Sequence, residues 1–263
     1  MARRLEDKVI IVTGASRGLG RYCAIEYGRE GATVIVAART EQQTDERLPG
    51  TIHETAAEVT AVGGHGVPIA VNMADPESIQ HLADSVFDQF GRIDVLMNNA
   101  GILPPGGITT VPTKHWDLEM RINLNGPFHL SRAVLPTMQS QGSGSIINIS
   151  SVAAESLMGH YGVSKKAVEA MTVAFAKEVS TSGIAVNALK PVGAIDTPGM
   201  RMGARDPSLF DELPPADRYV EAAVILALLT PETGTGLCLN DAEVIERFAD
   251  EASKKRLLAL PMR

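Results

Sequence analysis

The run Val9-Ile10-Ile11-Val12 leads directly into Thr13-Gly14-Ala15-Ser16-Arg17-Gly18-Leu19-Gly20, a β-branched stretch followed by a glycine-rich turn. Glycine lets a backbone approach a pyrophosphate closely, and the N-terminus of a following helix attracts the anion. The spacing here is G-x-x-x-G-x-G, which differs from the common G-x-G-x-x-G fingerprint. The order of strand, turn and helix predicts a dinucleotide site, and a merely tight turn is the alternative.

Further short apolar runs alternate with longer amphipathic stretches along the chain. Strands are predicted at 33–36, 67–71, 93–97, 145–149, 184–188 and 236–239, and helices near 18–30, 52–62, 76–90, 113–138, 161–181 and 215–229. Apolar strands joined by helical, right-handed crossovers form a parallel sheet that is covered on both faces. We therefore predict an α/β fold: a doubly wound, seven-stranded parallel sheet with helices on both faces, the Rossmann fold, as a single domain over residues 1–263.

The composition limits the possible partners. With 263 residues and 44% hydrophobic content the chain can bury one large core, and its net charge of −7 disfavours a nucleic-acid partner. No segment approaches the ~20 apolar residues of a membrane span, and the first residues lack the apolar run of a signal peptide. We expect no membrane partner.

The cysteines and histidines give no metal site. Cys23 and Cys238 lie far apart among apolar residues, which predicts buried free thiols and a cytoplasmic location. The six histidines are scattered, and no Cys/His cluster has the spacing of a zinc site.

Two segments interrupt the alternation of strands and helices. Residues 191–215 contain five prolines after the sixth predicted strand. Long irregular loops at the carboxyl end of a strand in such sheets are often lids, so we expect a substrate lid here. After the last predicted strand, residues 241–263 form a C-terminal tail with an acidic, helix-like stretch at 242–252.

The pair Tyr161 and Lys165 provides candidate acid–base chemistry. Residues four apart share a helix face, so the ammonium of Lys165 is expected near the Tyr161 hydroxyl. A nearby positive charge lowers the pKa of a phenol from its usual ~10. Such a phenol can donate a proton to an alkoxide or accept one from an alcohol. Taken alone, the pair is also common on ordinary helices.

The end of the second predicted strand indicates which dinucleotide binds. An acidic residue there usually recognises a ribose 2′-hydroxyl, but this chain has Ala38 followed by Arg39. Arg39 and Arg17 of the glycine turn could both pair with a 2′-phosphate. We therefore expect NADP(H) to be preferred, with NAD(H) as the second choice. The alternative is that both arginines are solvated surface residues.

Together these features resemble the short-chain dehydrogenase/reductase family over roughly residues 5–200. The resemblance rests on the turn at 13–20, on Asn98-Asn99-Ala100-Gly101, on Asn123 within Arg121-Ile122-Asn123-Leu124-Asn125, on Ser150-Ser151, and on Tyr161-x-x-x-Lys165. The segment at 48–56 and Gly63-Gly64 also look like hydroxysteroid-dehydrogenase-like members.

The resemblance implies roles for individual residues. Tyr161 is expected to exchange a proton with the substrate oxygen as hydride moves, with Lys165 lowering its pKa and Asn123 supporting a water relay. The cofactor is expected against Gly14, Ser16, Arg17, Gly18, Leu19, Gly20, Arg39, Asn72, Met73, Asn99, Ala100, Gly101, Tyr161, Lys165, Pro191 and Thr197. For the asparagines, structural bonding to the backbone is the alternative, and both readings can hold together.

The carbonyl-binding serine departs from the usual spacing. In most relatives a Ser stands thirteen positions before the Tyr, which is Asn148 here. A shortened loop at 152–160 assigns the role instead to Ser151, with Ser150 as its structural neighbour. The alternative is that both serines cap the strand end. Two other departures are Val192 in place of the glycine that usually follows the proline, and the absence of the Asp-Gly-Gly that often follows the last strand.

The substrate pocket is expected to be largely apolar, lined by Ile102, Leu103, Pro104, Met158, His160, Val192, Met200, Met202 and Phe210. This favours a hydrophobic ketone or secondary alcohol as the substrate. Two other functions stay open: a dinucleotide-requiring lyase or epimerase, and a catalytically silent dinucleotide-binding protein. Relatives are usually tetramers or dimers built through the two long central helices, so a homotetramer or homodimer is expected.

Overall fold

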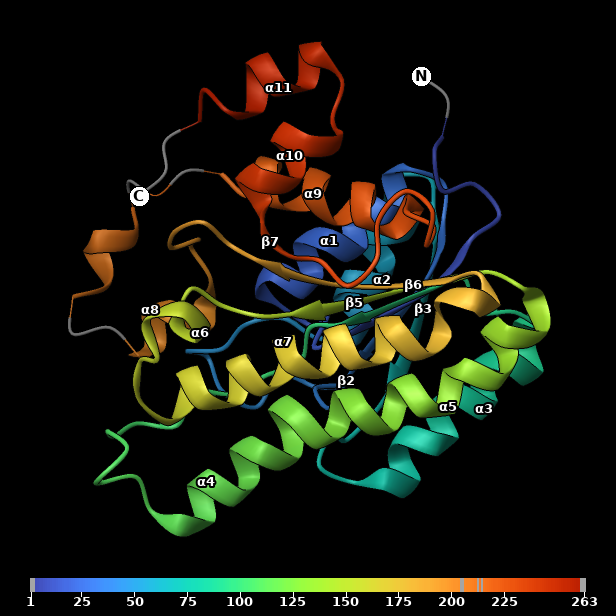
Figure 1. Cartoon of the computed structure of the whole chain (residues 1–263). Helices are drawn as coiled ribbons and strands as arrows, with labels where there is room; N and C mark the ends of the chain where they lie inside the picture. The colour runs from blue at the N-terminus through green and yellow to red at the C-terminus, as the bar shows by residue number, and fades with distance from the viewer. Residues whose placement is uncertain (1–2, 204–205, 212, 214, 261–263) are drawn as a thin grey trace.

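The computed structural model describes residues 3–203, 206–211, 213 and 215–260. Within them lies one sheet of seven strands in the order β3-β2-β1-β4-β5-β6-β7, all paired in parallel. The strands are β1 (Val9–Thr13), β2 (Thr33–Ala38), β3 (His65–Ala70), β4 (Val95–Asn98), β5 (Gly144–Ile149), β6 (Ile184–Lys190) and β7 (Cys238–Asn240). This is the predicted doubly wound fold in one domain (Figure 1).

Helices cover both faces of the sheet because successive strand residues point to opposite sides. Ile10 and Val12 pack with α1 (Gly18–Arg29), α2 (Ile52–Ala61), α9 (Asp217–Leu228) and α10 (Asp241–Phe248). Val9 and Ile11 pack with α3 (Pro76–Phe90), α5 (Gly126–Gln141) and α7 (Gly159–Val179). Figure 1 shows α1, α9 and α10 on one side of the sheet and α3, α5 and α7 on the other.

The long helix predicted at 113–138 is divided. It consists of α4 (Thr113–Met120), a π-helical turn (Arg121–Asn125) and α5. A π-helical turn inserts one extra residue into a helix and is frequent at functional sites. Here it carries Asn123, whose side chain is buried. The sequence pattern did not indicate this change of helix type, because apolar spacing is nearly the same in both.

The segments expected to be irregular contain helices as well. The 191–215 region carries α8 (Pro198–Gly203) and a 3₁₀ turn (Pro207–Phe210). The C-terminal tail forms α10 and α11 (Glu251–Leu257) rather than one helix, and side chains of Asn240 and Asp250 cap the two starts. Another short helix, α6 (Ala153–Ser156), occupies the shortened loop before α7.

The sheet topology places the predicted site residues at one edge. β2 and β3 lie on one side of β1 in the sheet, and β4 to β7 lie on the other side, so the strand order changes direction between the neighbours β1 and β4. The carboxyl ends of β1, β4, β5 and β6 therefore lie side by side, and ligands bind at such a switch point in open α/β sheets. The glycine turn, Asn99, Ser151 and Pro191 all follow these strand ends.

Candidate active site

The glycine turn after β1 is locked by Asn99. The Asn99 side-chain amide donates to the carbonyl of Thr13 at 2.8 Å and to that of Gly14 at 3.3 Å. A Cβ on Gly20 would lie 2.4 Å from the Asn99 amide nitrogen, and one on Gly14 would lie 2.8 Å from the Cα of Ala100. Gly14 also has φ +65, which side chains disfavour. These glycines therefore let β1 and β4 approach each other closely.

The N-terminus of α1 has the chemistry of an anion site. Its N-cap residue, Arg17, makes no side-chain capping hydrogen bond, whereas α2 and α3 are capped by the side chains of Thr51 and Asp75. The first N–H groups of a helix need an acceptor, and a phosphate supplies one. The turn thus fits a pyrophosphate both sterically and electrostatically.

Tyr161, Ser151 and Lys165 come together from α7 and the end of β5. The hydroxyls of Tyr161 and Ser151 are hydrogen-bonded. The ammonium nitrogen of Lys165 lies 5.6 Å from the centre of the Tyr161 ring and donates to the carbonyl of Ile149 at 2.7 Å. Ser151 Oγ also accepts the N–H of Ala153 at 3.2 Å. The serine therefore closes a turn at the start of α6 and faces Tyr161 at the same time.

The pKa values at this site differ from the sequence expectation. Burial raises the pKa of Tyr161 to about 12, and the Glu119 carboxylate adds to this shift, while the bond to Ser151 opposes it. Burial lowers the pKa of Lys165 to about 8, against the influence of Glu119. The expected lowering of the Tyr161 pKa is therefore wrong for this arrangement, because removal from water raises it and Lys165 contributes no resolved shift.

Asn123 connects the π-helical turn to the loop after β4. Its side chain accepts the N–H of Ile102 at 2.8 Å and donates to the carbonyl of Ile102 at 2.9 Å. A Cβ on Gly101 would lie 3.4 Å from Asn123 Oδ1 and 3.6 Å from the Lys165 ammonium. The backbone bonding foreseen as the alternative role of Asn123 is present, and the residue also lies beside Lys165.

Asn148 is committed to the protein interior. Its side chain donates to Thr172 at 2.9 Å and accepts from Asn98 at 2.9 Å, and it is buried. Ser150 is likewise buried and donates to Glu169 at 2.9 Å. Of the three polar residues at the end of β5, Ser151 is therefore the one next to Tyr161.

Arg17 and Arg39 differ in how they are held. Arg17 donates to the backbone carbonyls of Pro49 and Gly50 at 3.1 and 3.0 Å, which ties the turn to the loop before α2. Arg39 is exposed at the end of β2. Burial, together with the positive charge of Arg39, lowers the pKa of Arg17. Two guanidinium groups that repel each other form a natural place for an anion.

The remaining predicted cofactor residues lie around the same edge. The Asn72 side chain accepts the N–H of Ala74 and closes a turn, and Met73 is packed in the core against Gly126. A Cβ on Gly18 would lie 3.3 Å from Thr197, so the loop after β6 reaches the glycine turn. Pro191 precedes Val192, whose N–H donates to Asp241 at 2.5 Å.

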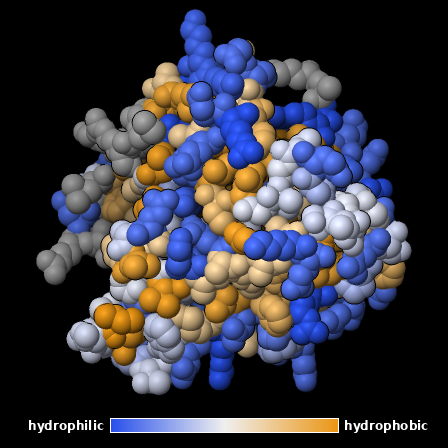
Figure 2. Space-filling model, in the orientation of Figure 1, coloured by the Kyte–Doolittle hydropathy of each residue, from blue (hydrophilic) through white to orange (hydrophobic). Residues whose placement is uncertain are grey.

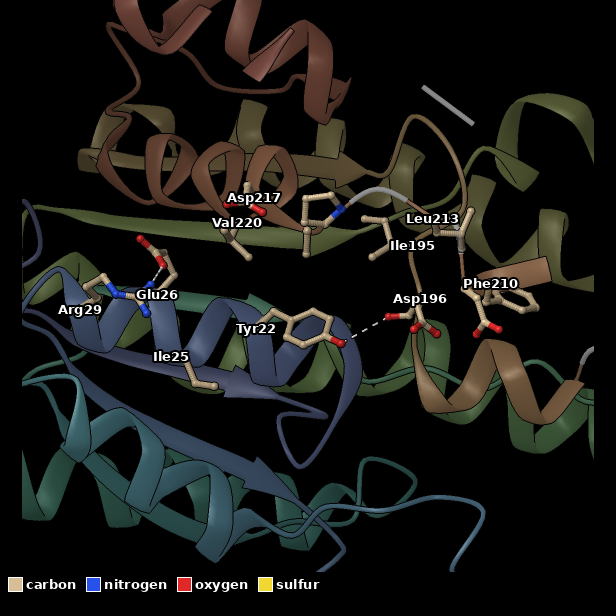
Figure 3. Close-up of a pocket in the computed structure, with 13 residues that line it drawn as sticks. Tyr22, Ile25, Glu26, Arg29, Ile195, Asp196, Phe210, Leu213, Asp217 and Val220 are labelled. Atoms are coloured by element: carbon tan, nitrogen blue, oxygen red, sulfur yellow. Dashed lines mark hydrogen bonds and ion pairs between the residues drawn. The ribbon is translucent and has the colours of Figure 1, made fainter. Parts of the chain in front are cut away.

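The 191–215 region borders a pocket on the α1 side of the molecule. Tyr22, Ile25 and Val220 face Ile195, Phe210 and Leu213 across a cavity of about 450 Å³ (Figure 3). The Tyr22 hydroxyl donates to the carbonyl of Asp196 at 3.4 Å. Phe210, expected in the substrate pocket, lines this cavity.

Exposed apolar side chains occur in the loop after β4, in the segment just before α7 and in α8. They are Leu103, Ile108, Leu157, Met158, Met200 and Met202. Figure 2 shows hydrophobic side chains at the end of the molecule where α6, the start of α7 and the loop before α4 lie. Leu157 has φ 50, a left-handed conformation unusual for a leucine, and is 64% exposed.

His160 is not available to a substrate as the sequence had suggested. It is buried, with Nδ1 2.5 Å from the Glu119 carboxylate and Nε2 3.1 Å from the carbonyl of Gly106. Sequence reasoning missed Glu119, and also Asp241 and Arg218, which form a buried ion pair at 2.7 Å. The sequence signal that could have indicated Glu119 is a charged residue at a helix position where the spacing predicts an apolar, buried one.

The comparisons with known proteins agree with this geometry. The sequence profile of the short chain dehydrogenase family matches residues 8–207. The chain is 36% identical over 200 residues to the 3-oxoacyl-acyl-carrier-protein reductase FabG of Thermotoga maritima, covering 74% of this chain and 77% of that protein. It is 33% identical to the short-chain reductase protein NovJ of Streptomyces niveus, covering 87% and 89%.

Other relatives are longer than this chain. Human hydroxysteroid dehydrogenase-like protein 2 is 32% identical over 248 residues, which cover 92% of this chain and 58% of the human protein. Among solved structures, a short chain dehydrogenase from Mycobacterium thermoresistibile superimposes with a TM-score of 0.82 at 26% identity, covering 95% and 93% of the two chains.

A Rossmann sheet with a Tyr-Lys pair, a serine and an asparagine at its carboxyl edge defines a dinucleotide-dependent oxidoreductase. The chain belongs to the short-chain dehydrogenase/reductase family. Over the described residues, none of the helices combines the length and the apolar character needed to span a bilayer.

Proposed function

We propose that this protein is an NADPH-dependent oxidoreductase that transfers a hydride between the nicotinamide and a hydrophobic ketone or secondary alcohol. The observation that carries the proposal is the hydrogen-bonded pair Tyr161 and Ser151 beside the buried Lys165. Exposed apolar side chains of Leu103, Leu157 and Met158, in the loop after β4 and just before α7, support a hydrophobic substrate. The reductase activities named for the relatives agree with this reaction class.

The choice of NADPH is supported by the arginines. Arg39 is exposed at the end of β2, and its charge acts on Arg17. A 2′-phosphate between them would neutralise both guanidinium groups. Ser16, Gly18, Leu19 and Gly20 would hold the pyrophosphate at the start of α1. Asn72, Met73, Ala100, Gly101, Pro191 and Thr197 are proposed to complete the cofactor site.

In the proposed mechanism the bound cofactor supplies or accepts the hydride. The Tyr161 hydroxyl donates a proton to the substrate oxygen during reduction and accepts it during oxidation. Ser151 Oγ accepts the N–H of Ala153, and its one O–H, which is hydrogen-bonded to Tyr161 here, is the donor that it would offer to the same substrate oxygen. The ammonium of Lys165 stabilises the phenolate that Tyr161 becomes. Asn123 is proposed to support the return of the proton from water.

The test combines cofactor binding with turnover. Fluorescence titrations with NADPH and NADH, followed by turnover of a panel of hydrophobic ketones, are expected to show tighter NADPH binding and ketone-dependent oxidation. Tyr161→Phe is expected to abolish turnover while leaving NADPH affinity nearly unchanged. Near wild-type activity in this variant would exclude Tyr161 as the acid. Tight binding without oxidation of the cofactor would favour a lyase or epimerase instead.

The remaining features of the proposal concern assembly and location. We propose that residues 191–215 act as a lid, since Thr197 touches the glycine turn from this segment. A homotetramer or homodimer is proposed through α5 and α7, which expose Phe128 and Val163. The free thiols of Cys23 and Cys238 are compatible with the cytoplasm as the proposed location.

A further inference from the structure

Glu119 is a fully buried carboxylate at the end of α4. Its Oε1 accepts the hydroxyl of Ser164 at 2.8 Å, and its Oε2 lies 2.5 Å from Nδ1 of His160. His160 and Ser164 are buried as well. Burying a carboxylate costs free energy unless the group is paired and hydrogen-bonded, so Glu119 depends on its contacts with His160 and Ser164.

The hydrogen-bond partners show where the protons of Glu119 and His160 lie. Nε2 of His160 faces the carbonyl of Gly106, which can only accept, so Nε2 carries a proton. One further proton must lie between Nδ1 and the Glu119 carboxylate, because two acceptors would repel each other there. The hydroxyl of Ser164 lies 2.8 Å from Glu119 Oε1 and 2.9 Å from the carbonyl of Tyr161, so the cluster also reaches the backbone of Tyr161.

The pair joins three parts of the proposed active site. His160 immediately precedes Tyr161, and Ser164 immediately precedes Lys165. Ser164 Oγ also accepts from the side chain of Asn123 at 3.2 Å. Through Gly106, His160 holds the loop between β4 and α4, which contains Leu103 and Ile108. One buried cluster thus fixes the first turn of α7, the π-helical turn and the apolar loop relative to one another.

We propose that Glu119 and His160 form an ion pair that holds the first turn of α7, the π-helical turn and the loop before α4 in place and thereby positions Tyr161 and Asn123. This rests on the proposed function for its consequence in catalysis. Neither residue touches the substrate in this proposal. Both act through Tyr161 and Asn123 and are positioning residues.

Other titratable groups face Tyr161 from the surrounding elements. Lys165 lies on the same helix, Glu119 comes from α4, and Tyr219 interacts with Tyr161 from α9. Of the charged groups, Glu119 raises the pKa of Tyr161. Replacing the carboxylate of Glu119 by a group of the same shape is the informative change.

Glu119→Gln makes that change. The glutamine oxygen can accept from Ser164 and its amide can donate to Nδ1 of a neutral His160, so both hydrogen bonds survive. We expect ¹⁵N NMR of the imidazoles at neutral pH to show both nitrogens of His160 protonated in the wild type and only Nε2 protonated in the variant.

Two further variants complete the experiment. Asp117→Asn removes an exposed carboxylate from the same helix and is expected to match the wild type. Glu119→Ala removes the hydrogen bonds as well and is expected to lower kcat, with recovery in Glu119→Gln. A neutral His160 in the wild type, or a kcat of Glu119→Ala equal to that of Asp117→Asn, would overturn the proposal. Absence of any wild-type turnover would count against the proposed function alone, and the NMR measurement would still decide the ion pair.

Discussion

At the scale of single residues, burial has more influence than sequence neighbours on the acid–base groups. Lys165 lies close to the Tyr161 ring, as a spacing of four predicts, yet the pKa of Tyr161 is raised. Both side chains are removed from water, and desolvation favours the neutral form of each.

The burial of Lys165 predicts an unusual pH dependence of stability. Its pKa is lowered from 10.5 to about 8, so between these values the unfolded chain binds a proton that the folded chain has released. Stability therefore rises with pH in that interval, and the cost of burying the charge is fully present below pH 8. We expect the stability advantage of Lys165→Met over the wild type to shrink by about 2 kcal/mol between pH 8 and 10.

Urea unfolding at these two pH values measures the effect. Lys177→Met, an exposed lysine on the same helix, is the matched control. A constant difference between Lys165→Met and the wild type would contradict the prediction. The interval ends at pH 10 because the raised pKa of Tyr161 gives the opposite slope above that value.

Arg39 carries the prediction about the cofactor. Arg39→Ala is expected to weaken NADPH binding by about 10–100-fold, because a hydrogen-bonded charge pair is worth about 1.5–3 kcal/mol. NADH binding is expected to change little, since it has no 2′-phosphate. Fluorescence titration of both cofactors checks this, with Arg47→Ala as a control from the same loop. Equal losses for NADPH and NADH would exclude the contact with the 2′-phosphate.

At the scale of elements, the C-terminal helices are connected to the loop after β6. Asp241, the first residue of α10, accepts the N–H of Val192 and pairs with Arg218 of α9 at 2.7 Å. Arg218 also donates to the carbonyl of Leu260 at 3.0 Å. Asp241 and Arg218 are both buried. The tail thereby supports the loop that is proposed to contact the nicotinamide.

Asp241→Asn tests this connection. The variant leaves Arg218 as a buried charge without its carboxylate, so we expect a loss of about 3 kcal/mol in the free energy of unfolding. The loop at Val192 also loses its acceptor or meets a second donor, which is expected to weaken NADPH binding several-fold. Thermal unfolding and cofactor titration measure the two effects. Glu246→Gln on the exposed side of α10 is the control, and an unchanged cofactor affinity in Asp241→Asn would refute the support of the loop.

At the scale of the whole molecule, α5 and α7 present apolar side chains on the face away from the sheet. The rings of Phe128 and Phe175 lie 6.1 Å apart, and the Arg132 guanidinium lies 5.4 Å from the Phe128 ring. Phe128 is 36% exposed. A large aromatic side chain left partly exposed beside another is typical of interfaces.

Phe128→Asp is expected to shift the assembly toward smaller species, because a symmetric interface would bring two new carboxylates together. Light scattering after size-exclusion chromatography measures the molar mass. Phe87→Asp on α3 exposes the same chemical change on another helix and is expected to leave the mass unchanged. An unchanged mass in Phe128→Asp would place the interface elsewhere.

Much of the fold could be predicted because its information is local. The apolar run at 9–12, the glycine turn and the alternation of strands and helices are each defined by a few neighbouring residues. Their hydrophobic period determines strand or helix, and right-handed crossovers then allow few arrangements. The grouping of Ser151 with Tyr161 and Lys165 was expected from the family resemblance. The π-helical turn and the helices within 191–215 were missed, because weak local patterns do not distinguish them.

By itself, the sequence determined the succession of strands and helices along the chain, the position of the glycine turn and the residue types at the carboxyl edge. Only the tertiary structure decided how those residues are charged and held. The pKa of Tyr161 depends on burial and on Glu119, which is 42 residues away along the chain. His160, a candidate substrate contact from the sequence, is a buried partner of Glu119 in the structure, which local sequence could not show. Desolvation and pairing are properties of the packed interior, where distant segments meet.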